Sequence, residues 1–193
     1  MSQVVIAGDT SGTITLQAPA VSGSTTLTLP ATTGTVLTNK TAGTILQVVS
    51  TTKTDTFSTV SAGSWIDVTG LSVSITPSSS SSKILVLYDT MIGPQDTGFV
   101  RIVRDSTAIK QGDAGSTRIR TTVGSITPGG NNDKSAPGAG NYLDSPASTS
   151  ALTYKIQVQN YTGTLYLNRS YNDSDASYSG RGASTITVME IAA

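Results

Sequence analysis

Histidine and cysteine are absent from this 193-residue sequence, and Glu190 is its one glutamate. Catalytic triads that use histidine as the base are therefore excluded, and so are ordinary zinc sites, whose ligands are mainly histidine and cysteine. No disulfide framework can form, which leaves the redox compartment open. A pair of catalytic carboxylates would have to consist of aspartates.

Charged and aromatic side chains are scarce: they make up 12% and 5% of the chain, and the net charge is zero. Nucleic acid and anionic membrane surfaces are therefore not favoured as partners. No apolar run approaches the roughly 20 residues of a membrane span. The first residues have neither the basic start nor the apolar stretch of a signal peptide, so we expect a soluble protein that leaves its cell only by lysis.

The abundant residues are serine, threonine and glycine, which are typical of strands and turns. The clearest pattern runs over residues 152–160, where apolar and polar side chains alternate. This two-residue period predicts a half-buried strand. A turn at residues 160–163 and a second apolar alternation at 165–167 then predict an antiparallel hairpin with one side on a core.

Further strands are expected at short intervals, at 45–49, 64–68, 71–75, 83–89, 98–104, 105–110, 118–123 and 184–191. The apolar run 84–87 predicts a central strand covered on both faces. The strands at 98–104 and 105–110 are expected to form a hairpin. Residues 127–150 and 170–182 are predicted to be loops. Because no helical period occurs, the sequence predicts an all-β fold, an antiparallel sandwich of two sheets.

The N-terminal part of the chain differs from the rest because it holds no aromatic residue. Short threonine-rich strands are predicted in it at 12–16, 25–29 and 35–37. Such a segment buries too little apolar surface to offset its ordering entropy. It is either a flexible arm or a segment that orders by pairing with other chains, and its alternation favours pairing. We therefore expect a β-rich anchoring and oligomerisation segment, 1–43, and a β-sandwich domain, 44–193.

Residues suited to catalysis or metal binding are few. Asp67, Asp89 and Asp144 have the positions of ordinary turn and strand-end aspartates. The stretch 173–177 loosely resembles a calcium loop, but the required glycine and the final acidic residue are missing. A solvated loop is the favoured interpretation, with a weak site at a subunit contact as the alternative. We predict no enzymatic activity and no cofactor.

Basic residues concentrate in one region of the sequence, at Arg101, Arg104, Lys110, Arg118 and Arg120. One interpretation is a surface for an anionic glycan or an acidic protein. The favoured one is a solvated sheet face, or arginines that pair with Asp105 and Asp113 within the same sheet. Trp65, the single tryptophan, lies in a predicted strand and is expected to pack on a sheet rather than stack on a sugar.

Two groups of motifs resemble virion proteins. Gly12-Thr-Ile-Thr-Leu16 and the stretch 25–37 resemble the N-terminal region of many tailed-phage virion proteins. The stretches 142–146, 153–157, 163–170 and 184–191 resemble a module in structural proteins of aquatic phages, cyanophages among them. The resemblance implies a trimeric jelly roll similar to the C1q and tumour-necrosis-factor fold, mounted on a short N-terminal anchoring segment. It implies no catalytic residues.

Two functions follow from this resemblance. The favoured one is a homotrimeric capsid decoration (cement) protein that stabilises the shell through the major capsid protein, assembled in the bacterial cytoplasm and released by lysis. The alternative is a tail fibre or spike tip that contacts other tail proteins and recognises a host surface glycan. Tyr166 is the candidate residue for the trimer interface. The candidates for receptor contact are Asn131, Asn132, Asp133, Lys134, Asp173, Asp175 and Arg181.

Overall fold

The structure is a computed structural model that describes residues 3–7, 13–17, 41–127 and 133–193. The chain divides into two units, Met1–Val36 and Leu37–Ala193. In the first unit, β1 (Gln3–Ala7) and β2 (Thr13–Gln17) form an antiparallel pair. The strand predicted at 12–16 is therefore confirmed as β2, whereas those predicted at 25–29 and 35–37 lie outside the described residues. The expected boundary at residue 43 stays a prediction.

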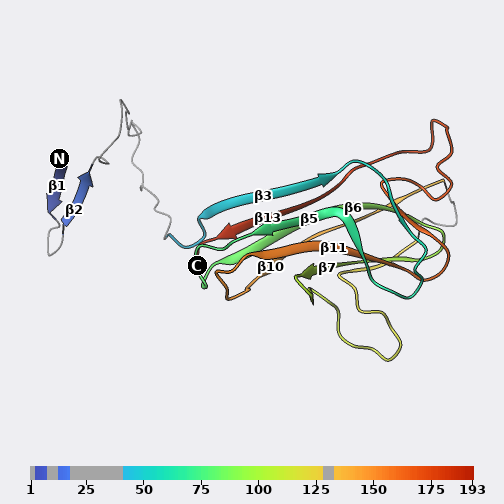
Figure 1. Ribbon diagram of the computed structural model, residues 1–193, viewed down its shortest axis with the longest axis horizontal. Helices are drawn as coiled ribbons and strands as arrows, with labels where there is room; N and C mark the ends of the chain where they lie inside the picture. The colour runs from blue at the N-terminus through green and yellow to red at the C-terminus, as the bar shows by residue number, and fades with distance from the viewer. Residues whose placement is uncertain (1–2, 8–12, 18–40, 128–132) are drawn as a thin grey trace. The chain divides into compact units, whose positions relative to one another are not determined.

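The second unit contains two antiparallel sheets (Figure 1). The first, called the β6 sheet, consists of β3 (Ile45–Lys53), β4 (Phe57–Thr59), β6 (Lys83–Pro94), β10 (Ala136–Asp144), β12 (Leu165–Leu167) and β13 (Ser184–Ile191). The second, called the β11 sheet, consists of β5 (Ile66–Ile75), β7 (Gly98–Arg104), β8 (Thr107–Ile109), β9 (Val123–Ile126) and β11 (Leu152–Asn160).

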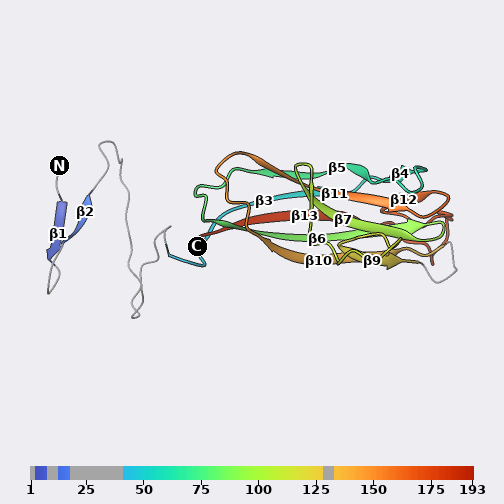
Figure 2. The same ribbon diagram turned by 90° about the horizontal axis from the view of Figure 1, so that it is seen from below.

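The two sheets form a jelly-roll sandwich, which confirms the predicted fold class. In Figure 2 the strands of both sheets run along the same long direction and overlap in the view. The strand order is β3-β13-β6-β12-β4 in one sheet, with β10 also on β6, and β5-β11-β7-β8 in the other, with β9 on β7. The chain passes repeatedly between the layers, as it does from β5 to β6 and from β6 to β7, which is the connectivity of a jelly roll.

The core lies between the layers and is built by the alternation of each strand. Ile84 and Val86 face inward from β6, and Ile156 and Val158 face inward from β11; all four are fully buried. Burying an aliphatic side chain of this size contributes about 1.5–3 kcal/mol. The two-residue period therefore identified the inward-facing side chains of β11 correctly.

The predicted hairpin over residues 152–169 is wrong. β11 pairs with β5 and β7 in one sheet, while β12 pairs with β6 and β4 in the other. The turn between them carries the chain across the sandwich, so Leu165 and Leu167 meet the core from the opposite layer, with no exposed surface. Alternation shows which side chains are buried, but it cannot tell which strand is the neighbour.

The long loop expected at 127–150 is also wrong, because the nine-residue strand β10 lies inside it. Its sequence, rich in glycine, alanine and proline, has a low β propensity. The strand forms because residues 136–144 pair with β6 over their whole length. β10 borders no further strand of the β6 sheet in the described part of the chain, and such an edge tolerates a proline.

Of the other strand predictions, some are confirmed and others are wrong. β7 and β8 form the predicted hairpin, and β13 occupies the predicted residues 184–191. The strand expected at 118–123 is wrong, since β9 begins only at Val123. β6 is central, as expected, with β10 on one side and β13 on the other. It is not covered on both faces in the single chain, because Leu85 and Leu87 are only partly buried.

Candidate functional site

An apolar row crosses the outer face of the β6 sheet. Cross-strand pairing places four residues side by side: Val48 of β3, Met189 of β13, Leu85 of β6 and Leu143 of β10. Val48 and Leu143 are 54% and 47% exposed. Each neighbour along its strand, such as Val188 beside Met189, faces the core instead. A row of directly opposed apolar residues on the solvent side of a sheet is a surface that favours a partner.

The row belongs to a larger patch at one end of the sandwich. We call this patch the basal apolar face, and it comprises Ile45, Val48, Leu85, Leu87, Leu143, Met189 and Ile191. The basal end is where the sandwich begins and finishes, since Gly43 and Thr44 form backbone hydrogen bonds with Ala192. Further from this end the face becomes polar, with Ser50 opposite Thr187 and Thr52 opposite Thr185.

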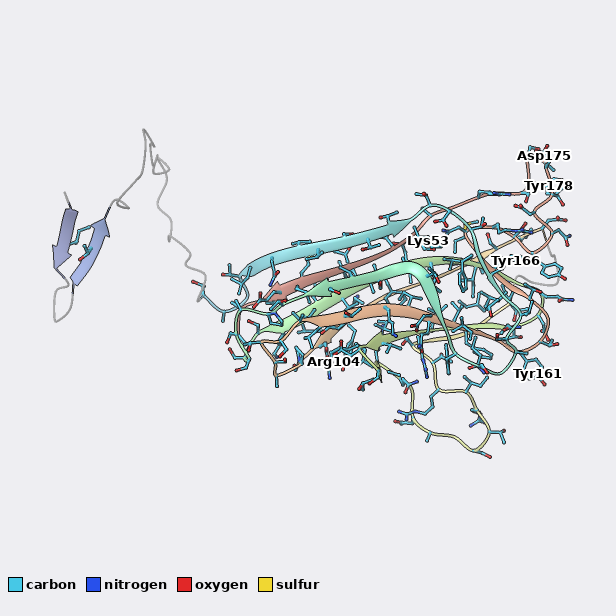
Figure 3. The ribbon with its side chains drawn as sticks, viewed as in Figure 1. Lys53, Arg104, Tyr161, Tyr166, Asp175 and Tyr178 are labelled. Carbon is cyan, nitrogen blue, oxygen red and sulfur yellow. The ribbon has the colours of Figure 1, made fainter. Side chains whose placement is uncertain are left out.

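The described residues predicted to contact a receptor lie at the other end, which we call the distal end; Figure 3 labels Asp175 there. The structure brings two of the predicted loops together there. Asp133 accepts hydrogen bonds from Asn172 (3.1 Å) and Ser174 (2.6 Å). Asp173 is bound by the guanidinium of Arg181 and lies 3.6 Å from that of Arg169.

The remaining predicted contact residues are placed as follows. Asp175 is exposed and lines a small depression of about 330 Å³ together with Asp173 and Arg181. Lys134 is exposed and precedes β10. Asn131 and Asn132 lie outside the described residues. A receptor role for any of these residues stays a prediction.

Tyr166, the candidate for a trimer interface, projects from β12 toward the outer side of the β6 sheet, since Leu165 and Leu167 face the core. Its ring packs edge-on against Tyr171 at 5.7 Å, and the guanidinium carbon of Arg169 lies 4.0 Å from the ring centre. The ring is half-buried by these contacts. Its place at a subunit contact stays a prediction.

Asp144, one of the three aspartates considered for catalysis, forms a buried polar cluster that links the two sheets. Its Oδ2 atom accepts a hydrogen bond from the hydroxyl of Tyr154 (2.7 Å) and an ion pair from Arg104 (2.5 Å). Burial raises the pKa of Tyr154, and the hydrogen bond to Asp144 raises this pKa further. The tyrosine therefore stays a neutral donor, and the arrangement is that of a structural tie.

Glu190 is fully buried near the basal end and is satisfied by neutral donors. Its carboxylate accepts hydrogen bonds from the Gln47 amide (2.6 Å) and from the Ser78 amide and hydroxyl, both at 2.7 Å. Burial raises the pKa of Glu190, but the hydrogen bonds from Gln47, Ser78 and Ser82 outweigh burial and leave this pKa below its ordinary value. Glu190 therefore holds the serine-rich loop against β13.

The outer face of the β11 sheet carries a network of polar groups around Asp67. Lys155 and Gln157 donate to its two oxygens at 2.7 and 2.6 Å. Gln157 in turn accepts from Arg101, whose guanidinium carbon lies 4.3 Å from the ring centre of Trp65. Trp65 is thus packed on the sheet with a cation over its ring.

The basic residues do not pair as predicted. Asp105 accepts a hydrogen bond from the Thr153 amide instead of binding an arginine. Arg104 pairs with Asp144, and the Arg120 guanidinium donates to the backbone oxygen of Gly112. Among the described residues, Asp113 has no arginine partner.

Metal-binding and membrane-spanning features are not found in the parts that the structure describes. These parts contain no group of three or more aspartate, glutamate, histidine or cysteine side chains placed to hold a metal ion. They also contain no helix long and apolar enough to cross a membrane.

Comparison with known proteins adds little to this description. No protein-family model and no curated protein matches the sequence. A chain in the solved structure of infectious bursal disease virus, Gt strain, is 13% identical, with a TM-score of 0.35 over 98% of this chain and 47% of that chain. This protein therefore spans about half the length of the viral chain. A likeness this weak carries no functional argument, so the chain's own topology establishes the all-β jelly-roll sandwich.

Proposed function

We propose that this protein is a non-enzymatic structural protein of a bacteriophage virion, a homotrimer that decorates and stabilises the capsid. The observation that carries the self-association is the basal apolar face, where four strands present aligned apolar side chains to solvent. The virion setting is supported by the sequence resemblance of residues 12–37 and of the C-terminal stretches to phage virion proteins.

The physical argument for self-association is the cost of leaving this face in water. Val48, Leu143 and Ile45 each keep about half of their surface exposed in the single chain. Covering them with the same patch of other copies would contribute about 25 cal/mol for each Å² of apolar surface removed from water. A flat sheet face suits this contact because its outward side chains end at a similar height, so that many of them can touch another flat surface at once.

The position of the loops supports a protein that contacts its partners through one end of the sandwich. The basal end carries both the start of the sandwich and the apolar patch, while the loop 170–182 lies at the distal end (Figure 1). In an assembly formed through the basal apolar face, the distal loops remain free. A decoration protein presents such a polar surface to solvent.

The test of self-association uses Leu85→Asp, with Ser72→Asp on the exposed face of the β11 sheet as the matched control. We expect the wild-type chain and Ser72→Asp to have three times the 19.7 kDa chain mass in sedimentation equilibrium. Leu85→Asp is expected to sediment at the chain mass, because association would bury an unpaired carboxylate in each subunit. A wild-type chain that stays monomeric at all concentrations contradicts the proposal.

Tyr166 supplies a second test. We expect Tyr166→Asp to weaken the trimer if the subunits also meet along β12. Light scattering of this variant on dilution measures the effect, and an unchanged mass at every concentration removes Tyr166 from the interface without affecting the argument for Leu85.

The second candidate function is a receptor-binding fibre or spike tip, favoured by one observation. Asp133 joins the loop before β10 to the loop 170–182, so two polar loops far apart in sequence form a single distal surface. Copy number in purified virions, measured by mass spectrometry against the major capsid protein, separates the two functions. An abundance similar to the capsid subunit supports decoration, and a few copies per particle support a tail location.

A further inference from the structure

A second surface feature lies on the outer side of the β11 sheet, away from the basal apolar face. It is a cavity of about 350 Å³ lined chiefly by Phe99, Thr117, Arg118, Ile119, Thr121 and Tyr161. Phe99 belongs to the outer face because its neighbour Val100 is fully buried in the core. Phe99 is nevertheless only 8% exposed, so it forms an apolar floor beneath the cavity.

The segment that walls the cavity is fixed to the edge of β7. The Thr122 amide donates to the Val100 carbonyl oxygen (3.0 Å), and the Thr122 hydroxyl accepts from the Ile102 amide (2.9 Å). A turn closed by the hydrogen bond from the Arg118 amide to the Gly115 oxygen (2.9 Å) presents Arg118 at the rim. The cavity is therefore part of the folded sandwich.

Arg118 differs from the other basic residues of its region. The charged groups of Arg101, Arg104 and Arg120 each donate a hydrogen bond, and Lys110 lies over the Tyr88 ring. Among the described residues, no hydrogen bond or ion pair engages the Arg118 guanidinium. An arginine free to make a bidentate contact selects a planar anion such as a carboxylate.

Tyr161 supplies the second half of the site. Its backbone amide donates a hydrogen bond to the Thr97 oxygen (2.8 Å), but the residue, labelled in Figure 3, is 66% exposed and lines the cavity. An exposed aromatic ring offers an apolar face with a polar tip, which matches the apolar face of a sugar ring and its hydroxyls. The exposed Thr117 adds a hydroxyl to the same cavity.

We propose that this cavity binds a carboxylated saccharide, with the sugar ring on Tyr161 and Phe99 and its carboxylate on Arg118. A neutral sugar leaves the guanidinium without a partner, and an acidic peptide makes no use of the aromatic surface. A phosphate group is disfavoured because, among the described residues that line the cavity, Arg118 is the single cation. The site goes beyond the proposed decoration role, since it would attach a capsid to acidic polysaccharide.

The test uses the full chain and three carboxylated probes: tri-galacturonate, a hyaluronan tetrasaccharide and sialyllactose. The methyl esters of tri-galacturonate and of the hyaluronan tetrasaccharide, and lactose for sialyllactose, are the neutral counterparts. Binding is measured by titration calorimetry and by the NMR signal of the Arg118 Nε–H group. We expect at least one carboxylated probe to bind at least about tenfold more tightly than its neutral counterpart and to shift this signal.

Arg118→Gln is expected to weaken binding about tenfold, and Tyr161→Ala to weaken it similarly. Arg120→Gln, in the same exposed segment but outside the cavity lining, is the matched control and is expected to bind like the wild type. All three residues are exposed, so equal thermal midpoints show that the fold is intact.

Three results would overturn the proposal: no binding of any carboxylated probe, equal binding of the neutral counterparts, or binding that survives Arg118→Gln. Tight binding of tetraglutamate that depends on Arg118 but not on Tyr161 would replace the saccharide with an acidic peptide. The cavity lies within one chain, so Leu85→Asp is expected to retain binding. A failure of self-association and a failure of this site are thus separate outcomes.

Discussion

At the scale of single residues, the two buried carboxylates are satisfied in different ways. Asp144 is compensated by a charge, Arg104, and by one neutral hydroxyl. Glu190 is surrounded by neutral donors from Gln47 and Ser78. Breaking a charged pair leaves the partner's charge partly buried, whereas removing a neutral donor costs less. The two sites therefore respond differently to substitution.

Asp144→Asn is expected to lower the free energy of unfolding by about 3 kcal/mol, because Arg104 loses its carboxylate while most of its side chain stays covered. Urea denaturation at neutral pH measures the change. Asp89→Asn, on the exposed outer face of β6, is the control and is expected to stay within about 0.5 kcal/mol of the wild type. Equal losses for both variants would show that the cluster is not a structural tie.

The lowered pKa of Glu190 predicts that the folded chain loses stability as the pH falls. Its pKa is lowered in the folded chain, so its stabilising effect is complete above the ordinary glutamate pKa and disappears as the pH falls through the folded pKa. Glu190→Gln is expected to be less stable than the wild type by about 2 kcal/mol at pH 7. The difference should shrink when urea denaturation is repeated at about pH 3. A difference that is constant with pH would contradict this account.

At the scale of elements, β10 needs a glycine at residue 138 because side chains of two other strands, β6 and β9, approach it closely. A Cβ atom added at Gly138 would lie 2.9 Å from the Thr90 hydroxyl and 3.0 Å from the Ile126 side chain. Gly138→Val is therefore expected to cost about 1–3 kcal/mol through overpacking. Ala139→Val, the next residue and exposed on the other face, is expected to be nearly neutral in the same denaturation experiment.

The elements also show what the sequence could reveal and what it could not. The sequence was sufficient to predict the strands β11 and β13, and the alternation in β11 also predicted its buried side chains. β10 was missed because its glycines and proline are typical of loops, and only its pairing with β6 makes it a strand. The apolar row was missed for a different reason: Val48 and Leu143 look like ordinary strand residues until register places them in line.

The proposed saccharide site illustrates the same limit at the level of side chains. The sequence drew attention to the group of basic residues, and an anionic glycan was one of its two interpretations. It could not tell which arginine lacks a partner, because that depends on contacts such as Arg104 with Asp144. Tyr161 was predicted only as a turn residue, and its position beside Arg118 comes from the fold.

At the scale of the whole molecule, the two outer faces of the sandwich have different characters. The β6 sheet presents an apolar patch, and the β11 sheet presents ion pairs, a stacked Trp65 and the cavity at Arg118. A protein that associated through the polar sheet would have to remove water from Lys155 and Asp67, which is costly. Association through the apolar sheet removes water from side chains that gain by it, and it leaves the cavity open.

If the chain associates through the basal apolar face as proposed, its thermal stability should depend on its concentration. If the folded chain associates and the unfolded chain does not, mass action raises the unfolding temperature as the chain concentration increases. We expect calorimetric scans over a hundredfold range of concentration to show a rising midpoint for the wild type and for Ser72→Asp. Leu85→Asp is expected to unfold at a constant, lower midpoint. A wild-type midpoint independent of concentration, together with a monomeric mass, would contradict self-association through the apolar face.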